Sequence, residues 1–232
     1  MFVMIKGVMF GRLCQAARFG VVALGVLSGV VAAQAQQFSA DIVRQRGAAA
    51  TPAGRLRVLD GKVRIETPEL ADGFFLVDAT KPSAYFVRPA ARIYMDARES
   101  SEFTRLFIPV DPDQPCRRWQ AMAHLAGLAE QGGWRCERTG EEEIDGRYAV
   151  IFHAVTGSGE FFGWIDRARK FPLRIKTEDG TIIALEQIRD EPQVGSLFEP
   201  PSNFRKFSPE ALIEQIKQSD VWVAGEKDKA AP

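Results

Sequence analysis

The sequence has few of the residues that most often carry chemistry at neutral pH. Of its 232 residues, three are cysteine and two are histidine. There is no GxSxG, P-loop or GxGxxG motif, and the histidines form neither an HxxxH nor an HExxH pattern. A serine-hydrolase triad, a nucleotide site and a paired-histidine zinc site are therefore unsupported. We expect a non-enzymatic protein with no cofactor and no metal.

Charge of one sign and long apolar runs are also missing. Thirty basic side chains balance thirty acidic ones, and no basic patch contains interleaved aromatic residues. We therefore expect no nucleic-acid partner. The apolar stretch 19–33 has 15 residues, whereas a membrane-spanning helix needs about 20.

Residues 1–35 have the three parts of a secretory signal peptide. Lys6, Arg12 and Arg18 occur without any acidic residue before the apolar stretch, and Ala33-Gln34-Ala35 matches the A-x-A cleavage pattern. A retained membrane anchor is the alternative, which the short stretch disfavours. We predict cleavage near Gln36. The mature protein would then be periplasmic and have no integral membrane segment.

Two cysteines remain in the predicted mature chain, Cys116 and Cys136. An even number of cysteines in an exported protein is typical of a disulfide. A reactive or metal-binding thiol pair is the alternative. The 19 intervening residues match neither C-x-x-C nor half of a zinc ribbon, so we predict a disulfide.

Short strands and tight turns occupy most of the mature chain. Asp-Gly between apolar runs is typical of a two-residue hairpin with a type I′ turn, and it occurs at Asp60-Gly61 and Asp179-Gly180. Residues 47–54 are small and turn-rich, which predicts a loop. The predicted strands are 38–45, 55–59, 62–66, 74–78, 84–87, 92–96, 148–155, 161–165, 173–177 and 181–188.

Several of these strands are apolar on both faces, which requires a cover on both sides of the sheet. Apolar periodicity predicts one helix at 116–131, and Ser208 before Pro209 predicts another at 209–218. We therefore predict an α+β fold: a single curved antiparallel β-sheet, an unclosed half-barrel, covered by two or three helices. Residues 36–223 would form one domain and 224–232 a flexible tail.

The polar residues that could do chemistry have simpler structural interpretations. His124 falls in the predicted helix and His153 in a predicted strand, and neither has a partner at a recognisable spacing. The carboxylates of 141–143 and Asp145 could pair for acid–base work. A solvated acidic turn before a hairpin explains them as well, and an enzyme remains the least favoured alternative.

Aromatic and apolar residues are the better candidates for a site. Each one alone is explained by core packing, but a curved sheet under a helical lid can leave an apolar cavity. Alternation places Phe161 and Ile165 on the face opposite Phe162 and Trp164. It leaves open which pair faces inward. The candidate cavity residues are Phe74, Leu76, Tyr85, Tyr94, Trp119, Met122, Phe152, Phe162 and Trp164.

Several segments resemble the LolA/LolB-type fold of periplasmic lipoprotein carriers. They are FSAD at 38–41, GRLRV at 54–58 with GKVRIE at 61–66, the meander 163–180, and LFEPP at 197–201. The resemblance implies an unclosed antiparallel barrel with a helical lid over an apolar cavity. Because Asp60-Gly61 and the cysteine-bounded helix depart from the carriers, we expect a relative rather than the carrier itself.

These observations lead to two hypotheses for function. The first is an exported protein that binds an apolar, lipid or lipoprotein ligand between sheet and helices, for example in outer-membrane lipoprotein or lipid trafficking. The second is an envelope-stress sensor or protein-interaction module that has an envelope protein as its partner and no small ligand.

Overall fold

The computed structural model describes residues 36–97, 101–128 and 133–218. The chain divides into two units, Met1–Gln34 and Ala35–Pro232, and the described residues all belong to the second. The predicted signal peptide and the predicted tail at 224–232 lie outside the described residues. In the described part of the chain, every helix is too short or too polar to span a lipid bilayer.

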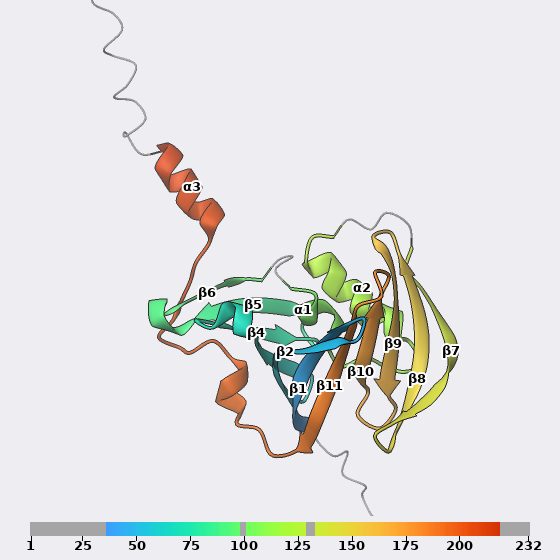
Figure 1. Cartoon of the computed structure of the whole chain (residues 1–232). Coiled ribbons are helices and arrows are strands. Elements are labelled where there is room, and N and C mark those ends of the chain that lie inside the picture. Colours follow the sequence, from blue (N-terminus) through green and yellow to red (C-terminus); the bar gives the residue numbers. More distant parts are fainter. Residues whose placement is uncertain (1–35, 98–100, 129–132, 219–232) are drawn as a thin grey trace, which may run out of the picture. The chain divides into compact units, whose positions relative to one another are not determined.

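Twelve strands of the described chain form one sheet (Figure 1). The strands are β1 (Gln37–Arg46), β2 (Ala49–Leu59), β3 (Lys62–Glu66), β4 (Phe74–Asp78), β5 (Ser83–Arg88), β6 (Ile93–Asp96), β7 (Arg135–Ile144), β8 (Arg147–Thr156), β9 (Gly159–Asp166), β10 (Phe171–Thr177), β11 (Ile182–Asp190) and β12 (Arg205–Lys206). The helices are α1 (Phe103–Leu106), α2 (Pro115–Leu125) and α3 (Pro209–Gln218), with short 3-10 turns η1 (Pro68–Leu70), η2 (Pro89–Ala91) and η3 (Gly195–Phe198).

Hairpin connections build the sheet in two halves that meet at β1 and β11. The strand order is β12-β6-β5-β4-β3-β2-β1-β11-β10-β9-β8-β7. Because β7 and β12 end the sheet and do not pair with each other, the curved sheet is not closed. Helices α1 and α2 lie on one of its sides (Figure 1). The predicted α+β class is confirmed, with one difference: β12 runs parallel to β6, because the chain returns along that edge.

The main hydrophobic core lies between the sheet and the segment that contains α1 and α2. In β2 and β3 the predicted alternation is confirmed, because Leu56, Val58 and Ile65 are completely buried there. In β4, whose two faces are both apolar, Phe75 and Val77 belong to this core. From the helical segment, the fully buried side chains include Phe107, Ile108 and Trp119.

The opposite face of β3, β4 and β5 has its own cover, the segment that follows β11. Leu76 and Val87 are buried on this face, and so is Phe198 in η3. The Arg64 guanidinium in β3 donates to the carbonyl of Leu197 at 3.3 Å, and Lys62 pairs with Glu199 at 2.7 Å. This cover explains why β4 is apolar on both faces.

Two of the three Asp-Gly hairpins have the backbone expected of type I′ turns. Asp60 and Gly61 have φ values of 46° and 90°, and Asp145 and Gly146 have values of 49° and 75°. The prediction is wrong for Asp179-Gly180, where only Gly180, at 80°, has positive φ. This turn is longer, because its outermost pair is Thr177 and Thr181, whose amide and carbonyl groups bond at 2.9 Å.

The loop predicted at 47–54 is instead the beginning of β2. Its small side chains give no alternation, but its backbone pairs with β1, and that pairing is set by the fold. Gly54 makes the pairing fit. It has a φ of 154°, and a β-carbon there would lie 2.4 Å from the carbonyl oxygen of Glu66. The only turn in this stretch is the one at Gly47, where φ is 61°.

The helices follow the sequence signals to different degrees. Helix α3 has the predicted bounds, and the hydroxyl of Ser208 accepts a bond from the amide of Ala211 at 3.2 Å. Helix α2 begins at Pro115 and ends at Leu125, well before residue 131, and 129–131 lie outside the described residues. The single-turn helix α1 was not predicted. None of the residues of α3 is buried.

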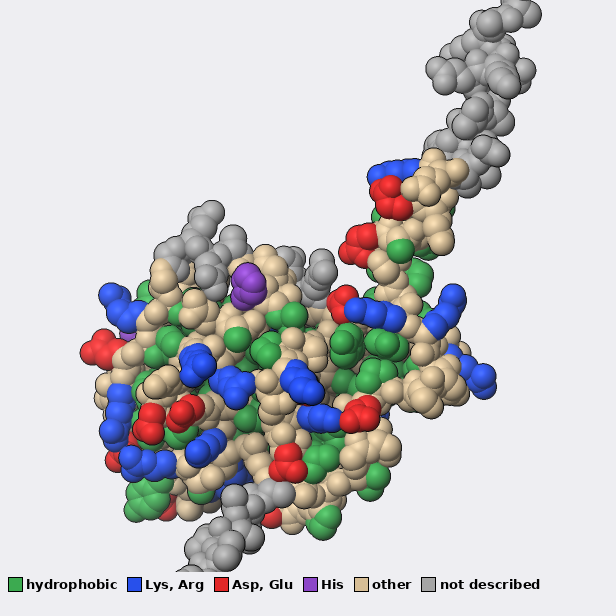
Figure 2. All heavy atoms as spheres, turned by 180° about the vertical axis from the view of Figure 1, so that it is seen from behind, with side chains coloured by type: hydrophobic (Ala, Val, Ile, Leu, Met, Phe, Trp, Pro, Cys, Tyr) green, Lys and Arg blue, Asp and Glu red, His purple; other side chains and the backbone are tan. Residues whose placement is uncertain are grey.

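Charged side chains of both signs occur over the face shown in Figure 2, with hydrophobic side chains between them. Many of the described charges are paired. Arg169, for example, contacts Asp166 at 2.9 Å and Asp190 at 2.5 Å. An exposed pair contributes at most about 1 kcal/mol. The pairing therefore says more about the even balance of surface charge than about stability.

Candidate functional site

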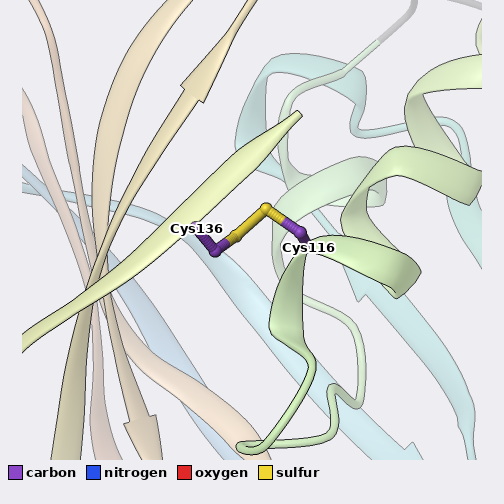
Figure 3. Close-up of a disulfide and its surroundings, with 2 residues drawn as sticks. All are labelled: Cys116 and Cys136. Atoms are coloured by element: carbon purple, nitrogen blue, oxygen red, sulfur yellow. A yellow bond between two sulfur atoms is a disulfide. The ribbon is translucent and has the colours of Figure 1, made fainter. Parts of the chain in front are cut away.

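Helix α2 is attached to the sheet at its first turn. Cys116 forms the predicted disulfide with Cys136 at the beginning of β7, with 5.7 Å between their α-carbons (Figure 3). In the chain-entropy model, a crosslink over 20 residues stabilises the fold by about 3 kcal/mol. One turn further on, the Trp119 side chain is completely buried. Its indole nitrogen donates to the carbonyl of Leu106 at 3.1 Å.

The Trp119 ring lies directly against the backbone of β9 at Gly163. A β-carbon at Gly163 would lie 2.7 Å from Trp119 Cη2, which is too close for any real side chain. Phe161, two residues earlier in β9, meets the edge of the Trp119 ring at 5.0 Å between centroids. Trp134 contacts Phe161 in the same manner at 6.2 Å. The absence of a side chain at Gly163 therefore leaves the space that Trp119 needs to pack with Phe161 and Trp134.

A cleft of about 540 Å³ opens beside the aromatic group, at the ends of β1, β9 and β10 and next to α2. Clefts that bind small molecules typically measure about 300–1,000 Å³. Trp119 is completely buried and Phe161 is 8% exposed, so the accessible apolar surface of the cleft comes mainly from the half-buried Leu106, Leu128 and Trp134. The apolar residues of the floor are Leu106, Trp119, Ala123, Leu128, Trp134 and Phe161.

Charged side chains surround the mouth of this cleft. Arg44 in β1 contacts Glu102 at 3.3 Å and Glu69 at 3.5 Å. Arg46, two residues later, pairs with Asp179 in the turn after β10. Hydroxyl groups of Thr156, Ser158 and Thr181 complete this side of the rim. The site thus combines an apolar interior with a polar, charged entrance.

Asp179 is the most strongly perturbed carboxyl group of the rim. Its pKa lies well below the ordinary value, first because it accepts a hydrogen bond from the hydroxyl of Thr177. The amide of Thr181, the guanidinium of Arg46 and the hydroxyl of Thr181 lower the pKa further. All four donors favour the ionised form. Asp179 therefore carries its negative charge at the entrance at neutral pH.

The structure separates the nine predicted cavity residues. Trp119 lines the cleft described above. Phe152 is buried in the main core. Met122 faces a separate groove of about 500 Å³ between α2 and the β5–β6 edge, which Tyr85 also lines. The face covered by η3 also carries predicted residues, because Leu76 is buried there.

The remaining candidates lie away from the cleft. Phe74 packs under the guanidinium of Arg64, 3.4 Å from its ring centroid, and borders a third groove of about 950 Å³. Tyr94 makes an edge contact with Tyr85 at 5.4 Å. Lys206 from β12 lies 5.6 Å from the Tyr85 ring. Tyr85 and Tyr94 thus contact β12 where it pairs with β6 at the edge of the sheet.

Phe162 and Trp164 lie on the outer face of β9, which answers the question that alternation left open. Phe161 and Ile165 face the core. Phe162 stacks on His153 at 4.5 Å, and the indole of Trp164 donates to Glu142 at 2.6 Å. Glu142 lies in β7, so the acidic turn predicted at 141–143 is wrong: these residues are part of a strand.

Neither histidine belongs to the cleft lining found among the described residues. The His153 imidazole lies 2.9 Å from the carboxylate of Glu160, at the outer face. His124 is exposed on α2 and borders the groove beside β5 and β6. In the described part of the chain, no three His, Cys, Asp or Glu residues are grouped so that they could hold a metal ion.

The floor residues that the sequence did not single out are Leu106, Ala123, Leu128, Trp134 and Phe161. Ala123 and Leu128 belong to the apolar stripe predicted for 116–131, so periodicity was an available signal. Phe161 shares parity with Gly163, and a glycine in a strand often marks a close approach. Trp134 is preceded by two glycines and has no periodic neighbours, which leaves it without a sequence signal.

No family model matches this chain, and no curated protein matches it. Several solved structures show distant similarity. PNGF-II is 8% identical over 79% of this chain and 33% of that chain, with a TM-score of 0.48. MucB is 14% identical over 72% and 58%, with a TM-score of 0.40. A putative outer membrane lipoprotein-sorting protein domain from Vibrio parahaemolyticus is 12% identical over 70% and 89%, with a TM-score of 0.32. Similarities this distant assign no family and no function.

Proposed function

We propose that this protein is a non-enzymatic, exported binding protein that holds one apolar chain in the cleft beside α2. Its place would be the periplasm, after removal of residues 1–35. The observation that supports this proposal is the aromatic floor of Trp119, Trp134 and Phe161 under a charged mouth. An alkyl chain or an apolar side chain of a ligand would lie on the floor, and its polar end would remain at the entrance.

The size of the site supports a small ligand and limits its affinity. Over most of the sheet, the space under α1 and α2 is occupied by the protein's own side chains, such as Phe38, Phe107 and Ile108. Of the openings beside α2, the cleft of about 540 Å³ is the one lined by Trp119, Trp134 and Phe161, and another is the groove of about 500 Å³ next to β5 and β6. Each buried methylene would contribute about 0.8 kcal/mol. Such a site would select ligands by the length and width of their apolar group and by little else.

The polar groups of the rim support binding rather than catalysis. Arg44 and Arg46 are engaged by carboxylates, and the carboxylate of Asp179 is held by hydroxyl, amide and guanidinium donors. A general base needs a free lone pair within reach of the proton that it removes. The lone pairs of the Asp179 carboxylate are already used by these donors, which suits an entrance that keeps its shape.

A neutral fluorophore tests the proposal directly. Protein exported with its own amino-terminal segment is stripped of lipid and titrated with N-phenyl-1-naphthylamine, whose emission rises in apolar surroundings. We expect saturable binding to one site. The variant Ala123→Leu, which fills the cleft from α2, should weaken binding about tenfold, because the ligand loses most of its contact with the floor.

His124→Leu is the matched control, since it places the same side chain on the neighbouring residue of α2, which borders a different groove. It should change binding less than twofold. Thermal melts of both variants show whether the fold is intact. Failure of stripped wild-type protein to bind the fluorophore would contradict the proposal. Equal binding by the two variants would place the ligand elsewhere.

A second function, protein interaction, is favoured by helix α3. Its apolar residues Leu212, Ile213 and Ile216 are 44%, 51% and 44% exposed. A helix with such a stripe is suited to a groove in another protein. Ile213→Glu should release any envelope protein that co-purifies through α3, whereas Gln215→Glu adds the same charge to the same helix and should not. Retention of the partner by Ile213→Glu would rule out α3 as its binding element.

A further inference from the structure

We infer that the cleft selects ligands whose apolar chain ends in a cationic group, and that it disfavours anionic amphiphiles such as fatty acids. The inference rests on the proposed function and concerns the head group at the same site. It follows from which charges at the mouth are already paired and which are not. The apolar floor would be shared by all ligands, so selection would lie at the entrance.

The arginine nearest to the β10 turn is already paired with a carboxylate. Arg46 pairs with Asp179, and that carboxylate also accepts bonds from the Thr177 hydroxyl at 2.6 Å and from the Thr181 amide at 3.1 Å. Because Asp179 already balances the charge of Arg46, an incoming carboxylate would add a second negative charge to a neutral pair. It would therefore gain less there than at an unpaired arginine.

Arg44 is engaged in a similar way. It lies between two carboxylates, those of Glu102 at 3.3 Å and Glu69 at 3.5 Å. A third carboxylate at this guanidinium would be repelled by both. The local charge around Arg44 is therefore negative in spite of the arginine, and an anionic head group would meet net repulsion there.

Glu178 presents the opposite situation. It lines the cleft and is exposed, and it forms no hydrogen bond or ion pair with any residue that the structure describes. A β-carbon at Gly159 would lie 2.7 Å from Glu178 Oε2, so the carboxylate lies over the first residue of β9. Among the described residues it has no cationic partner there. An ammonium or guanidinium group entering the mouth would pair with it and break no existing contact.

The size of the preference follows from the exposure of Glu178. Ion pairs between exposed groups are weak, and one such pair corresponds to about a two- to fivefold change in affinity. We expect the repulsion of an anionic head group by Glu178, Glu69 and Glu102 to change affinity by a similar factor. We therefore expect decylammonium to bind about fivefold more tightly than decanol, and decanoate to bind more weakly than decanol.

The experiment is a competition of these three decyl compounds against N-phenyl-1-naphthylamine on stripped wild-type protein, at low and at high salt. Glu178→Gln should bring the decylammonium and decanol affinities together. Glu186→Gln, which removes the same charge beside a different groove, should preserve the difference. High salt should reduce the preference in wild type, because exposed charges are screened.

The outcomes separate the two proposals. If no decyl compound displaces the fluorophore, the binding function itself fails. If decanoate binds as tightly as decylammonium or more tightly, the cleft binds amphiphiles but the inference about charge is wrong. Loss of that tight decanoate binding in Arg105→Gln would identify Arg105, the third arginine of the cleft lining, as the anchor of an anionic ligand.

Discussion

Replacement of Gly163 by alanine tests whether the aromatic floor depends on the missing side chain. The new methyl carbon would lie 2.7 Å from Trp119 Cη2, 3.2 Å from Trp119 Cζ2 and 3.4 Å from Ile175 Cδ1. Overpacking of this kind costs about 1–3 kcal/mol. Loss of a flexible glycine from the unfolded chain returns about 0.4–1 kcal/mol. We expect Gly163→Ala to lower the free energy of unfolding by about 1–2 kcal/mol.

The assay is urea unfolding at neutral pH, followed by far-UV circular dichroism. Gly140→Ala in β7 is the matched control, because its methyl group would meet only Ile151 Cδ1 at 3.7 Å, an ordinary contact. Its stability should be unchanged or higher by up to about 1 kcal/mol. The fluorophore affinity of Gly163→Ala should also fall, since a displaced Trp119 ring changes the floor of the cleft.

A double substitution identifies the responsible atoms. Phenylalanine has no counterpart of Trp119 Cζ2 or Cη2, so Trp119→Phe removes both close contacts. In that background, Gly163→Ala should cost nothing, which gives a coupling energy of about 1–2 kcal/mol between the two positions. Equal effects of Gly163→Ala and Gly140→Ala, or a coupling energy near zero, would refute the close packing of Trp119 on β9.

Three other changes test the disulfide, the charged rim of the cleft and the pairing of β1 with β2. Replacement of Cys116 and Cys136 together by serine should lower the free energy of urea unfolding by about 3 kcal/mol. Reduction of the wild-type protein by dithiothreitol should cause the same loss. If neither treatment changes the unfolding free energy, the disulfide has no role in stability. Asp179→Asn should be less stable than wild type at pH 7, and the difference in thermal melting temperature should shrink below about pH 4. The sign follows because the pKa of Asp179 is lower in the folded protein than in the unfolded chain. Ionised Asp179 therefore stabilises the fold above the pKa of the unfolded chain, and this contribution is lost as the carboxylate is protonated at lower pH. A difference that stays constant down to about pH 2 would argue against this reasoning. Gly54→Ala should cost more than about 2 kcal/mol in the same urea assay, because its φ of 154° and the 2.4 Å approach to Glu66 exclude a side chain, and a stable variant would show that β2 can pair without this bend.

Local signals were enough for most of the strands and for one helix. Alternation in β2 and β3 and the pair Asp60-Gly61 predicted a hairpin that the structure confirms residue by residue. Ser208 before Pro209 predicted the first turn of α3 in the same way. These features depend on neighbours within a few residues, so the sequence contains what they require.

Features that depend on partners far along the chain were missed or incomplete. The first half of β2 has small side chains with no pattern, and it becomes a strand because β1 pairs with it. The parallel pairing of β12 with β6 joins residues more than 100 positions apart. For strands that are apolar on both faces, alternation cannot say which face meets the core, because either choice buries hydrophobic side chains.

The cleft shows this division most clearly. Its floor and rim come from β1, α2, β9 and the turn after β10, and no motif spans them. Trp119 was predicted as a candidate, whereas Phe161 was assigned only to one of two faces. Gly163 determines which face of β9 meets α2. It has no side chain on the face that carries Phe161, and this lets Trp119 of α2 approach β9 there.

The sequence by itself determined the class of fold, the hairpin at Asp60-Gly61 and the pairing of the two cysteines, because each depends on composition or on short-range spacing. Only the tertiary structure decided which face of β9 lines a site, which charges at its mouth are already paired, and that most of the space under the helices is filled by the protein's own side chains. Those properties arise where separate elements meet, and the geometry of that meeting is set by packing of the whole domain.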